Sequence, residues 1–412
     1  MFKQKPKTKR KPRSSEIRHY NDRDEALEVA LHYGFLPIQT PVISKEDARL
    51  AKNITPVDIA STDHSHAPHV EEKIALIRTY NDQDMQTREP VLWYYEGEFS
   101  GSGRRNDSRY TKIGLEVLGS SSAMAEALLI QTARAIAEDK GFTDIRLELN
   151  SLGDKDSLIK FSRELQGYYR KHLGDMPAEC RQLLKKDVFE LHATHEPTCQ
   201  PIIAAAPKAI DFLSDTSRAH LMELLSYAEH IDLPYSLNHS LVGGRNYSTH
   251  TIFELRGRRH DSEHVLGFGI RYNALGKKTG SKRDMPAVGI TLCWKRDPKE
   301  KTKNRIKLEA PHYFFVHVAS GAKYKSLRIL EILRKAGVSI GHALLKDKLT
   351  AQLAQAEHVK SPHILLMGQK ESVDNSVIVR TVENRSQETV PVVRLPEFIA
   401  EQHSRVVKKK LI

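Results

Sequence analysis

Two glycines stand directly before an alternating run of residues in the stretch SLVGGRNYSTHTIFEL, residues 240–255. The alternation predicts a strand, and Gly243 and Gly244 give the preceding turn a flexible backbone. Two interpretations are open: a loop that cradles a ligand, or a site from which a working side chain has been lost. Arg245 is the cation of this loop. Side chains two positions apart in an extended segment point to the same face, so its guanidinium can reach the space beside Gly243.

Two sets of side chains combine metal-ligand types with short spacing. They are Asp63, His64, His66 and His69, in a loop-like stretch, and Cys180, His192, His195 and Cys199. Neutral imidazoles and thiolates are good zinc ligands. However, no Cys-x-x-Cys pair anchors the second set. A solvated loop and an ordinary helical insertion explain the two sets more simply, so we predict no metal site.

The N-terminal segment is strongly basic. The formal net charge is +12, and seven lysines and arginines in the first 13 residues supply +7 of it, which leaves +5 for the rest. A basic run that contains Pro6 and Pro12 cannot bury a core, so we predict a disordered tail over residues 1–15 that attracts polyanions. Lys9, Arg10 and Lys11 are its candidate RNA-binding residues. A solubilising tail without a partner is the alternative.

The composition indicates a protein of more than one domain that does not cross a membrane. The chain has 412 residues, more than a single core usually serves. Hydrophobic residues make up 39% and charged residues 28%, and no apolar run approaches the ~18 residues of a membrane span. The three cysteines are too few for a disulfide framework, and the N-terminus lacks the apolar region of a secretory signal. We therefore expect a reducing, cytoplasmic setting.

The elements that hold these side chains form two expected domains. The first, residues 16–297, begins with a helix over 24–33, an extended stretch over 35–43, and a hairpin of VLWYYEGEF and RYTKIGLEVLG. A helix capped by one of the serines 120–122 follows, then the strand IRLELN, a helical insertion over about 157–231, and the strands YSTHTIFEL, HVLGFGI and AVGITLCW. The hairpin loop carries Arg104 and Arg105, two further candidate RNA-binding residues.

A second domain follows a polar, lysine-rich linker over residues 298–311. Over residues 312–402, strands such as YFFVHVA and HILLMG alternate with helices such as KSLRILEILRKAG and TAQLAQAEHV. This alternation predicts a small α/β domain with a mixed sheet. Residues 403–412 are expected to form a basic C-terminal tail.

Four stretches of the chain resemble histidyl-tRNA synthetases, a family of class II aminoacyl-tRNA synthetases. KIGLEVLG (112–119) is similar to the end of the second class II motif, and RLELNSLGD (146–154) to the strand and turn after it. SLVGGRNYSTHTIFE is similar to the histidine-specific LVRGLDYY signature. FGIRYNAL, followed by PAVGITLCWKR, resembles the glycine-rich strand and the third motif. The C-terminal block resembles the family's anticodon-binding domain, so the resemblance covers nearly the whole chain after the tail.

The resemblance implies an α+β fold: an antiparallel six-stranded catalytic sheet with a helical insertion, followed by an anticodon-binding α/β domain. The family activates histidine with ATP and magnesium and transfers it to the tRNA 3′ end, usually as a homodimer. We therefore expect tRNA, of the tRNA-His type, or another RNA as partner, histidine as a candidate ligand, and a homodimer. Lys346 and Lys348 are the candidate contacts to the anticodon stem.

Five residues match functional positions of the family. Glu116 matches the carboxylate that reads the histidine side chain, and Tyr247 is the first tyrosine of the signature. Arg271 and Tyr272 match the glycine-rich strand, and these four are the candidate substrate-binding residues. Arg296 matches the third-motif arginine on the ATP phosphates and, with Arg245, is a candidate catalytic residue. A purely fold-maintaining role for the retained residues is the alternative.

Other functional positions of the family are replaced. In the second motif, Ser100 and Ser102 stand where the family has the arginine and the glutamate of Phe-Arg-x-Glu. In the histidine signature, the catalytic arginine falls on Gly243, the aspartate on Asn246 and the second tyrosine on Ser248. Negative charge builds up at the α-phosphate during activation, so the reaction needs cations there. We therefore interpret the loop at Gly243 as a site that has lost its working side chains, rather than as a loop that cradles a ligand.

These replacements predict a divergent paralogue that binds RNA and whose adenylation chemistry is weakened or lost. ATP and magnesium are expected only if the protein is active. One alternative is a working histidine–tRNA ligase in which Arg245, Arg104 or Arg105 compensates for the missing cations. Another is a regulatory paralogue, like the synthetase-like subunit of ATP phosphoribosyltransferase, which senses histidine. That subunit lacks an anticodon-binding domain, which makes it the weaker alternative.

Overall fold

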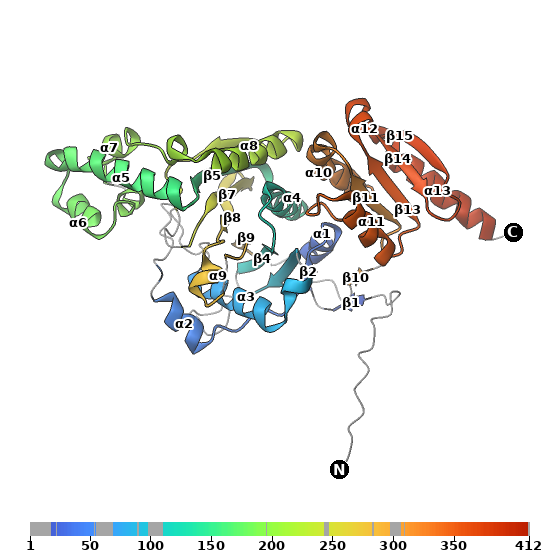
Figure 1. Ribbon diagram of the computed structural model, residues 1–412, viewed down its shortest axis with the longest axis horizontal. Coiled ribbons are helices and arrows are strands. Elements are labelled where there is room, and N and C mark those ends of the chain that lie inside the picture. The colour runs from blue at the N-terminus through green and yellow to red at the C-terminus, as the bar shows by residue number, and fades with distance from the viewer. Residues whose placement is uncertain are drawn as a thin grey trace, which may run out of the picture. The chain divides into compact units, whose positions relative to one another are not determined.

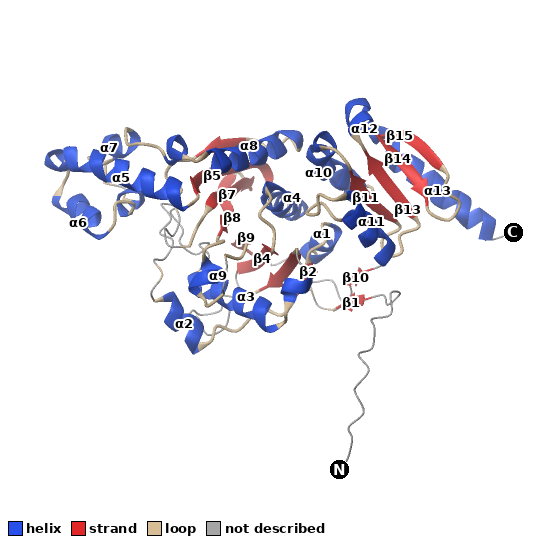
Figure 2. Cartoon of the chain, viewed as in Figure 1, coloured by secondary structure: helices blue, strands red, loops and turns tan. Residues whose placement is uncertain are grey.

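The computed structural model describes residues 18–21, 23–52, 54, 69–88, 90–97, 110–194, 196–242, 247–281, 284–296, 306–308 and 310–410. The chain divides into two compact units, each with its own sheet (Figures 1 and 2). Residues 26–301 form the catalytic-like unit, and residues 1–25 together with 302–412 form the C-terminal unit. None of the described helices is long and apolar enough to cross a bilayer.

The catalytic-like unit is built on an eight-stranded sheet of order β2-β3-β4-β9-β8-β7-β5-β6. Its strands are β2 (Leu36–Pro37), β3 (Val91–Glu96), β4 (Tyr110–Leu118), β5 (Thr143–Gly153), β6 (Tyr235–Leu237), β7 (His250–Arg259), β8 (Ser262–Arg271) and β9 (Ala287–Lys295). The inner six pair antiparallel, and β2 and β6 add parallel edges. The antiparallel sheet and the α+β class are thus confirmed, and so is the β3–β4 hairpin.

Helices of the catalytic-like unit cover the sheet and lead into it. They are α1 (Ala26–His32), α2 (Lys45–Ala51), α3 (Val70–Asp82), α4 (Ala123–Asp139) and the short α9 (Leu275–Lys278). Ser122 caps α4 as expected, because its Oγ accepts a hydrogen bond from the Met124 amide at 3.3 Å. Nearly every residue of α4 is buried, which fits its alanine-rich and leucine-rich sequence. The sequence analysis does not identify α2 and α3.

The helical insertion contains α5 (Lys155–Lys171), α6 (Ala178–Lys186), α7 (Gln200–Ala204) and α8 (Asp215–His230). Asp154 caps α5, and hydrogen bonds from Ser214, Ser157 and Ser217 outweigh burial and hold the pKa of its carboxyl well below the usual range.

A disulfide joins Cys180 to Cys199 within the insertion. The number and spacing of the cysteines do not predict this pairing. The two residues are 19 positions apart, and the fold of the insertion brings them together.

The C-terminal unit holds a mixed five-stranded sheet of order β12-β11-β13-β14-β15. Its strands are β11 (Tyr313–His317), β12 (Ile340–His342), β13 (His363–Met367), β14 (Ser376–Thr381) and β15 (Gln387–Pro391), and its helices are α10 (Ser320–Lys335), α11 (Leu349–His358), α12 (Gln369–Asp374) and α13 (Leu395–Lys410). β11 pairs parallel with β12 and β13, whereas β14 and β15 are antiparallel. The expected mixed α/β arrangement is present.

Both ends of this unit differ from the expected boundaries. β1 (Arg18–Tyr20), expected in the first domain, pairs antiparallel with β10 (Ile306–Leu308), expected in the linker. Ile306 is buried, so this lysine-rich stretch contains an apolar residue that packs into the unit. At the other end, α13 continues to Lys410, into the stretch expected as the basic C-terminal tail. Leu395 and Ile399 bury one side of this helix at its start.

Candidate functional site

Glu116 lies at the centre of a buried polar cluster on one face of the large sheet. Its carboxylate, on β4, accepts a hydrogen bond from the Tyr272 hydroxyl at 2.6 Å and one from the Tyr95 hydroxyl at 3.2 Å. Lys73, on α3, forms a buried ion pair with Oε1 of Glu116. Its Nζ lies 5.2 Å from the centre of the Tyr272 ring. We call Lys73, Tyr95, Glu116 and Tyr272 the Glu116 cage.

Two glycines make room for the Glu116 cage. A Cβ at Gly289, opposite Glu116 on β9, would lie 1.9 Å from Oε2 of that carboxylate. A Cβ at Gly114 would lie 1.8 Å from the Tyr95 ring. Only glycine therefore fits at either position without displacing the cage. Burial, with a further contribution from the Glu116 charge, raises the pKa of Tyr95 and Tyr272 well above the usual range, so both hydroxyls remain donors.

The sequence analysis does not identify Lys73, although α3 contains a signal for it. Lys73, Leu76, Ile77 and Tyr80 follow the spacing i, i+3, i+4, i+7, which places them on one helical face, and all four are buried. A lysine at a core position is almost never fully buried unless it is paired. This pattern indicates an internal partner, and the fold supplies Glu116, 43 residues further along the chain.

Arg271 and Tyr272 have different functions although they are neighbours. Successive side chains of an extended strand point to opposite faces of a sheet. Arg271, the last residue of β8, therefore faces α4, where its guanidinium makes a two-point ion pair with the buried Glu126. It also donates to the carbonyl oxygens of Ser120 and Ser122 at 2.9 and 3.2 Å. These contacts favour the fold-maintaining interpretation of Arg271, whereas Tyr272 joins the Glu116 cage.

Glu126 has three further polar neighbours on the helix side of the sheet. The His220 ring, on α8, lies 2.8 Å from its Oε1, and Thr251 donates to the same oxygen at 3.2 Å. Burial would raise the pKa of Glu126, but Arg271 and His220 outweigh it and lower that pKa below the usual range. The His250 ring packs 4.9 Å from the His220 ring. Arg271, His220, Thr251, His250 and Glu126 form what we call the Glu126 network.

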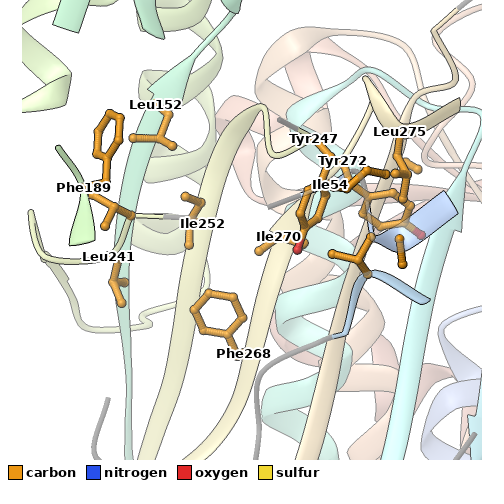
Figure 3. Packing of buried hydrophobic residues seen from close by; sticks show 14 of the residues in the cluster. Ile54, Leu152, Phe189, Leu241, Tyr247, Ile252, Phe268, Ile270, Tyr272 and Leu275 are labelled. Atoms are coloured by element: carbon orange, nitrogen blue, oxygen red, sulfur yellow. The ribbon is translucent and has the colours of Figure 1, made fainter. Parts of the chain in front are cut away.

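Tyr247 and Ser248 carry buried polar atoms at the start of β7. Within the described part of the chain, neither the Tyr247 hydroxyl nor Oγ of Ser248 has a hydrogen-bond partner. Burial, with a smaller contribution from Glu71, raises the pKa of Tyr247. Figure 3 shows Tyr247 within the hydrophobic cluster that also contains Tyr272. Buried polar atoms without a protein partner commonly contact water or a ligand, so Tyr247 remains a candidate substrate contact.

The remaining candidate residues are dispersed. Arg296 directly follows β9 and is exposed. Lys346 is half-buried and donates to Gln355 Oε1 at 3.4 Å, and Lys348 is exposed just before α11. The other candidates lie outside the described residues, namely Lys9, Arg10, Lys11, Arg104, Arg105 and Arg245.

The chemistry that the described side chains support follows from the Glu116 cage. In the Glu116 cage the carboxylate and the Tyr272 ring suit a compact cation, which Lys73 supplies, and the two phenolic hydroxyls donate to the carboxylate. No group of three or more His, Cys, Asp or Glu that could hold a metal ion occurs among the residues described here.

Comparison with known proteins covers both units. The family model described as "Anticodon binding domain" matches residues 316–402. Histidine–tRNA ligase of Dehalococcoides mccartyi is 28% identical over 391 residues, covering 90% of this chain and 93% of that protein. The histidine–tRNA ligase of Fervidobacterium nodosum is 27% identical over 385 residues, with 88% and 90% covered. The crystal structure of apo S. aureus histidyl-tRNA synthetase is 21% identical, with 90% and 92% covered and a TM-score of 0.49.

The curated relatives and the C-terminal domain agree with the motif order in the sequence. The similarity extends through the sheet, the insertion and the anticodon-binding domain rather than being confined to one of them. Over about nine-tenths of its length the chain is therefore similar to histidine–tRNA ligases, and its C-terminal unit matches an anticodon-binding domain.

Proposed function

We propose that this protein binds tRNA and that its ATP-dependent activation of histidine is weakened or lost. The observation that carries the proposal is the buried ion pair between Lys73 and Glu116. Glu116 matches the family carboxylate that reads the histidine side chain. An imidazole at that carboxylate would have to displace an ammonium that the chain itself supplies.

The burial of the pair makes such displacement costly. The Lys73 and Glu116 side chains are 1% and 0% exposed. Removing one partner of a buried ion pair typically costs about 3–5 kcal/mol, and the two hydroxyl donors that Glu116 keeps reduce this cost to about 2–3 kcal/mol. Histidine would have to repay this cost before it gained any binding energy. The pair therefore acts against histidine binding at the Glu116 cage.

The loss of cations at the positions expected to face the ATP phosphates should weaken histidine activation further. Ser100 and Gly243 stand where the family has arginines. Removing one preorganised donor typically lowers the rate by ~10² to 10³, and two independent losses approach ~10⁵. The anticodon-binding match and the basic N-terminal segment both favour retention of RNA binding.

Histidine-dependent exchange of labelled pyrophosphate into ATP tests the proposal. We expect no exchange above background with the purified protein, while a tRNA-His transcript binds in a filter assay. An Arg296→Ala variant serves as the control. Exchange that requires histidine and disappears in that variant would overturn the proposal.

The second candidate function is a working histidine–tRNA ligase. It is favoured by the similarity to ligases over nine-tenths of the chain. In that case Arg245 or Arg296 would supply the missing charge, and Lys73 would have to leave Glu116 when histidine binds. Exchange activity abolished by Arg245→Ala would support this function. A histidine-sensing regulatory role is the weakest candidate, since the chain carries the anticodon-binding match.

A further inference from the structure

A cavity of about 870 Å³ lies beside the C-terminal ends of α3 and α9, at one end of the large sheet (Figure 1). Its lining comes from three separate parts of the chain: residues 80–86, Gly119 and residues 279–286. The Gly119 amide donates to the Pro286 carbonyl at 2.7 Å, which fixes the cavity to the point where β4 ends and β9 begins. Small-molecule sites commonly have volumes of ~300–1,000 Å³, so a whole ligand fits here.

The cavity is distant from Arg296, the candidate contact to the ATP phosphates. Pro286 directly precedes β9, whereas Arg296 directly follows it. The nine residues of β9, at ~3.3 Å per residue, extend over roughly 30 Å. One nucleotide cannot contact both ends of such a strand, so the cavity is separate from the site expected for ATP.

Two amide side chains at the cavity form an edge with one donor and one acceptor. Gln86 Nε2 donates to Asn81 Oδ1 at 3.3 Å, and neither side chain has another hydrogen bond among the residues that the structure describes. The Asn81 amide nitrogen is therefore left as a donor and Gln86 Oε1 as an acceptor. Adenine has an amino donor beside a ring-nitrogen acceptor, and amide side chains commonly bind that edge.

The loop after α9 offers groups that suit the rest of a nucleoside. Asp284 Oδ2 accepts a hydrogen bond from Lys277 at 2.8 Å, which leaves Oδ1 as an acceptor. A carboxylate binds a ribose hydroxyl in this way in dinucleotide-binding folds. Ser281 adds a hydroxyl that can donate and accept. Met285 and Pro286 add apolar surface against which a flat base can pack.

The charges at the cavity disfavour a phosphate group. Among the described residues that line it, Asp284 is the single charged side chain, and Lys277 pairs with it. The C-terminal end of α3 carries partial negative charge, to which Asp82 in its last turn adds. The two basic residues at 282–283 lie outside the described part of the chain. An uncharged nucleoside therefore suits the described lining better than a nucleotide.

We propose that this cavity binds a purine nucleoside of the adenosine type. The Asn81 amide donates to a ring nitrogen of the base, Gln86 accepts from its amino group, and Asp284 accepts from a ribose hydroxyl. The inference does not rest on the proposed tRNA binding, because the lining belongs to the catalytic-like unit and contains no candidate RNA contact.

Isothermal titration calorimetry of the full-length protein with adenosine tests the inference. We expect saturable binding that Asn81→Ala/Gln86→Ala weakens about tenfold, because the two-point contact to the base is lost. Gln83→Ala removes an exposed amide of the same turn that does not line the cavity, so this matched control should bind like the unchanged protein. Asn81 and Gln86 are exposed, so their removal should barely change the thermal denaturation midpoint.

Two related ligands test the separate parts of the contact. Purine riboside lacks the amino group of adenosine and should bind about tenfold more weakly, because Gln86 Oε1 then has no donor. AMP should bind several-fold more weakly than adenosine, because its phosphate meets the negative end of α3.

Three outcomes would overturn the inference. They are an absence of adenosine binding at about 1 mM ligand, equal affinities of the unchanged protein and Asn81→Ala/Gln86→Ala, and tighter binding of AMP than of adenosine. The second outcome would place adenosine at another site, and the third would exclude an uncharged ligand. None of them affects the proposed tRNA binding, which the filter assay tests separately.

Discussion

Two buried carboxylates of the catalytic-like unit, Glu126 on α4 and Glu116 on β4, illustrate two uses of an ion pair. Glu126 holds a guanidinium by two parallel contacts, and that guanidinium also donates to two helix-end carbonyls. Glu116 holds the single ammonium of a flexible lysine, with two tyrosines completing the coordination. The guanidinium of arginine is planar and makes several hydrogen bonds at once, which suits a fixed structural contact. The lysine is instead a compact point charge on a flexible stem, without the fixed geometry of arginine.

Removal of Arg271 should have the largest effect. Arg271→Met leaves Glu126 buried without its main partner, so we expect a loss of about 3–5 kcal/mol in the free energy of unfolding. Urea denaturation followed by circular dichroism measures this. A loss below about 1 kcal/mol would remove the contrast between the two carboxylates.

Removal of Lys73 should lower the free energy of unfolding by less, and a small cationic ligand should restore part of the loss. Lys73→Ala leaves Glu116 with two hydroxyl donors, so we expect a loss of about 2–3 kcal/mol. The space left beside the carboxylate can accept imidazole or methylamine. Either compound at ten times its Kd should restore about 1.4 kcal/mol.

Thermal denaturation with increasing imidazole makes this measurement. Lys73→Met, which removes the charge but keeps the volume, is the matched control and should not respond. Equal responses of the two variants would show that the space beside Glu116 is not a cation site.

Acid should lower the free energy of unfolding by a smaller amount, through His250 of the Glu126 network. Burial, together with nearby His220 and Arg271, lowers the pKa of His250 from 6.5 to about 4. The unfolded chain therefore binds a proton that the folded chain does not between these values, and stability falls as pH drops from about 6.5 to about 4. We expect His250 to account for about 2 kcal/mol over this range, because partial solvent access reduces the full linkage effect. His250→Asn should flatten the pH dependence of urea midpoints, and an unchanged slope would exclude His250 as the source.

An exposed ion pair should contribute the least to the free energy of unfolding. Arg146 and Glu263 lie 2.6 Å apart at 36% and 46% exposure. Such pairs usually contribute less than about 1 kcal/mol, so Arg146→Ala should barely move the urea midpoint. The same denaturation series measures it. A larger loss would mean that burial is not what separates the two carboxylates from surface pairs.

Local patterns in the sequence predict much of the fold. The β3–β4 hairpin and the serine cap of α4 each depend on residues close together in the chain. The resemblance likewise leads to Glu116 and Tyr272. Distant pairings are harder to predict: Lys73 meets Glu116 across 43 residues, and Arg271 meets Glu126 across 145. Which face of the sheet each side chain occupies depends on strand register, and motif matching does not supply that register.

The pairing of β1 with β10 affects how the chain matures during synthesis. Arg18 lies opposite Leu308, a residue made about 290 positions later. At ~5–20 residues per second, the ribosome needs roughly 15–60 s to cover that distance. The catalytic-like unit can therefore complete its sheet while the N-terminal strand has no partner. The C-terminal unit closes last, after the first and last parts of the chain have both left the ribosome.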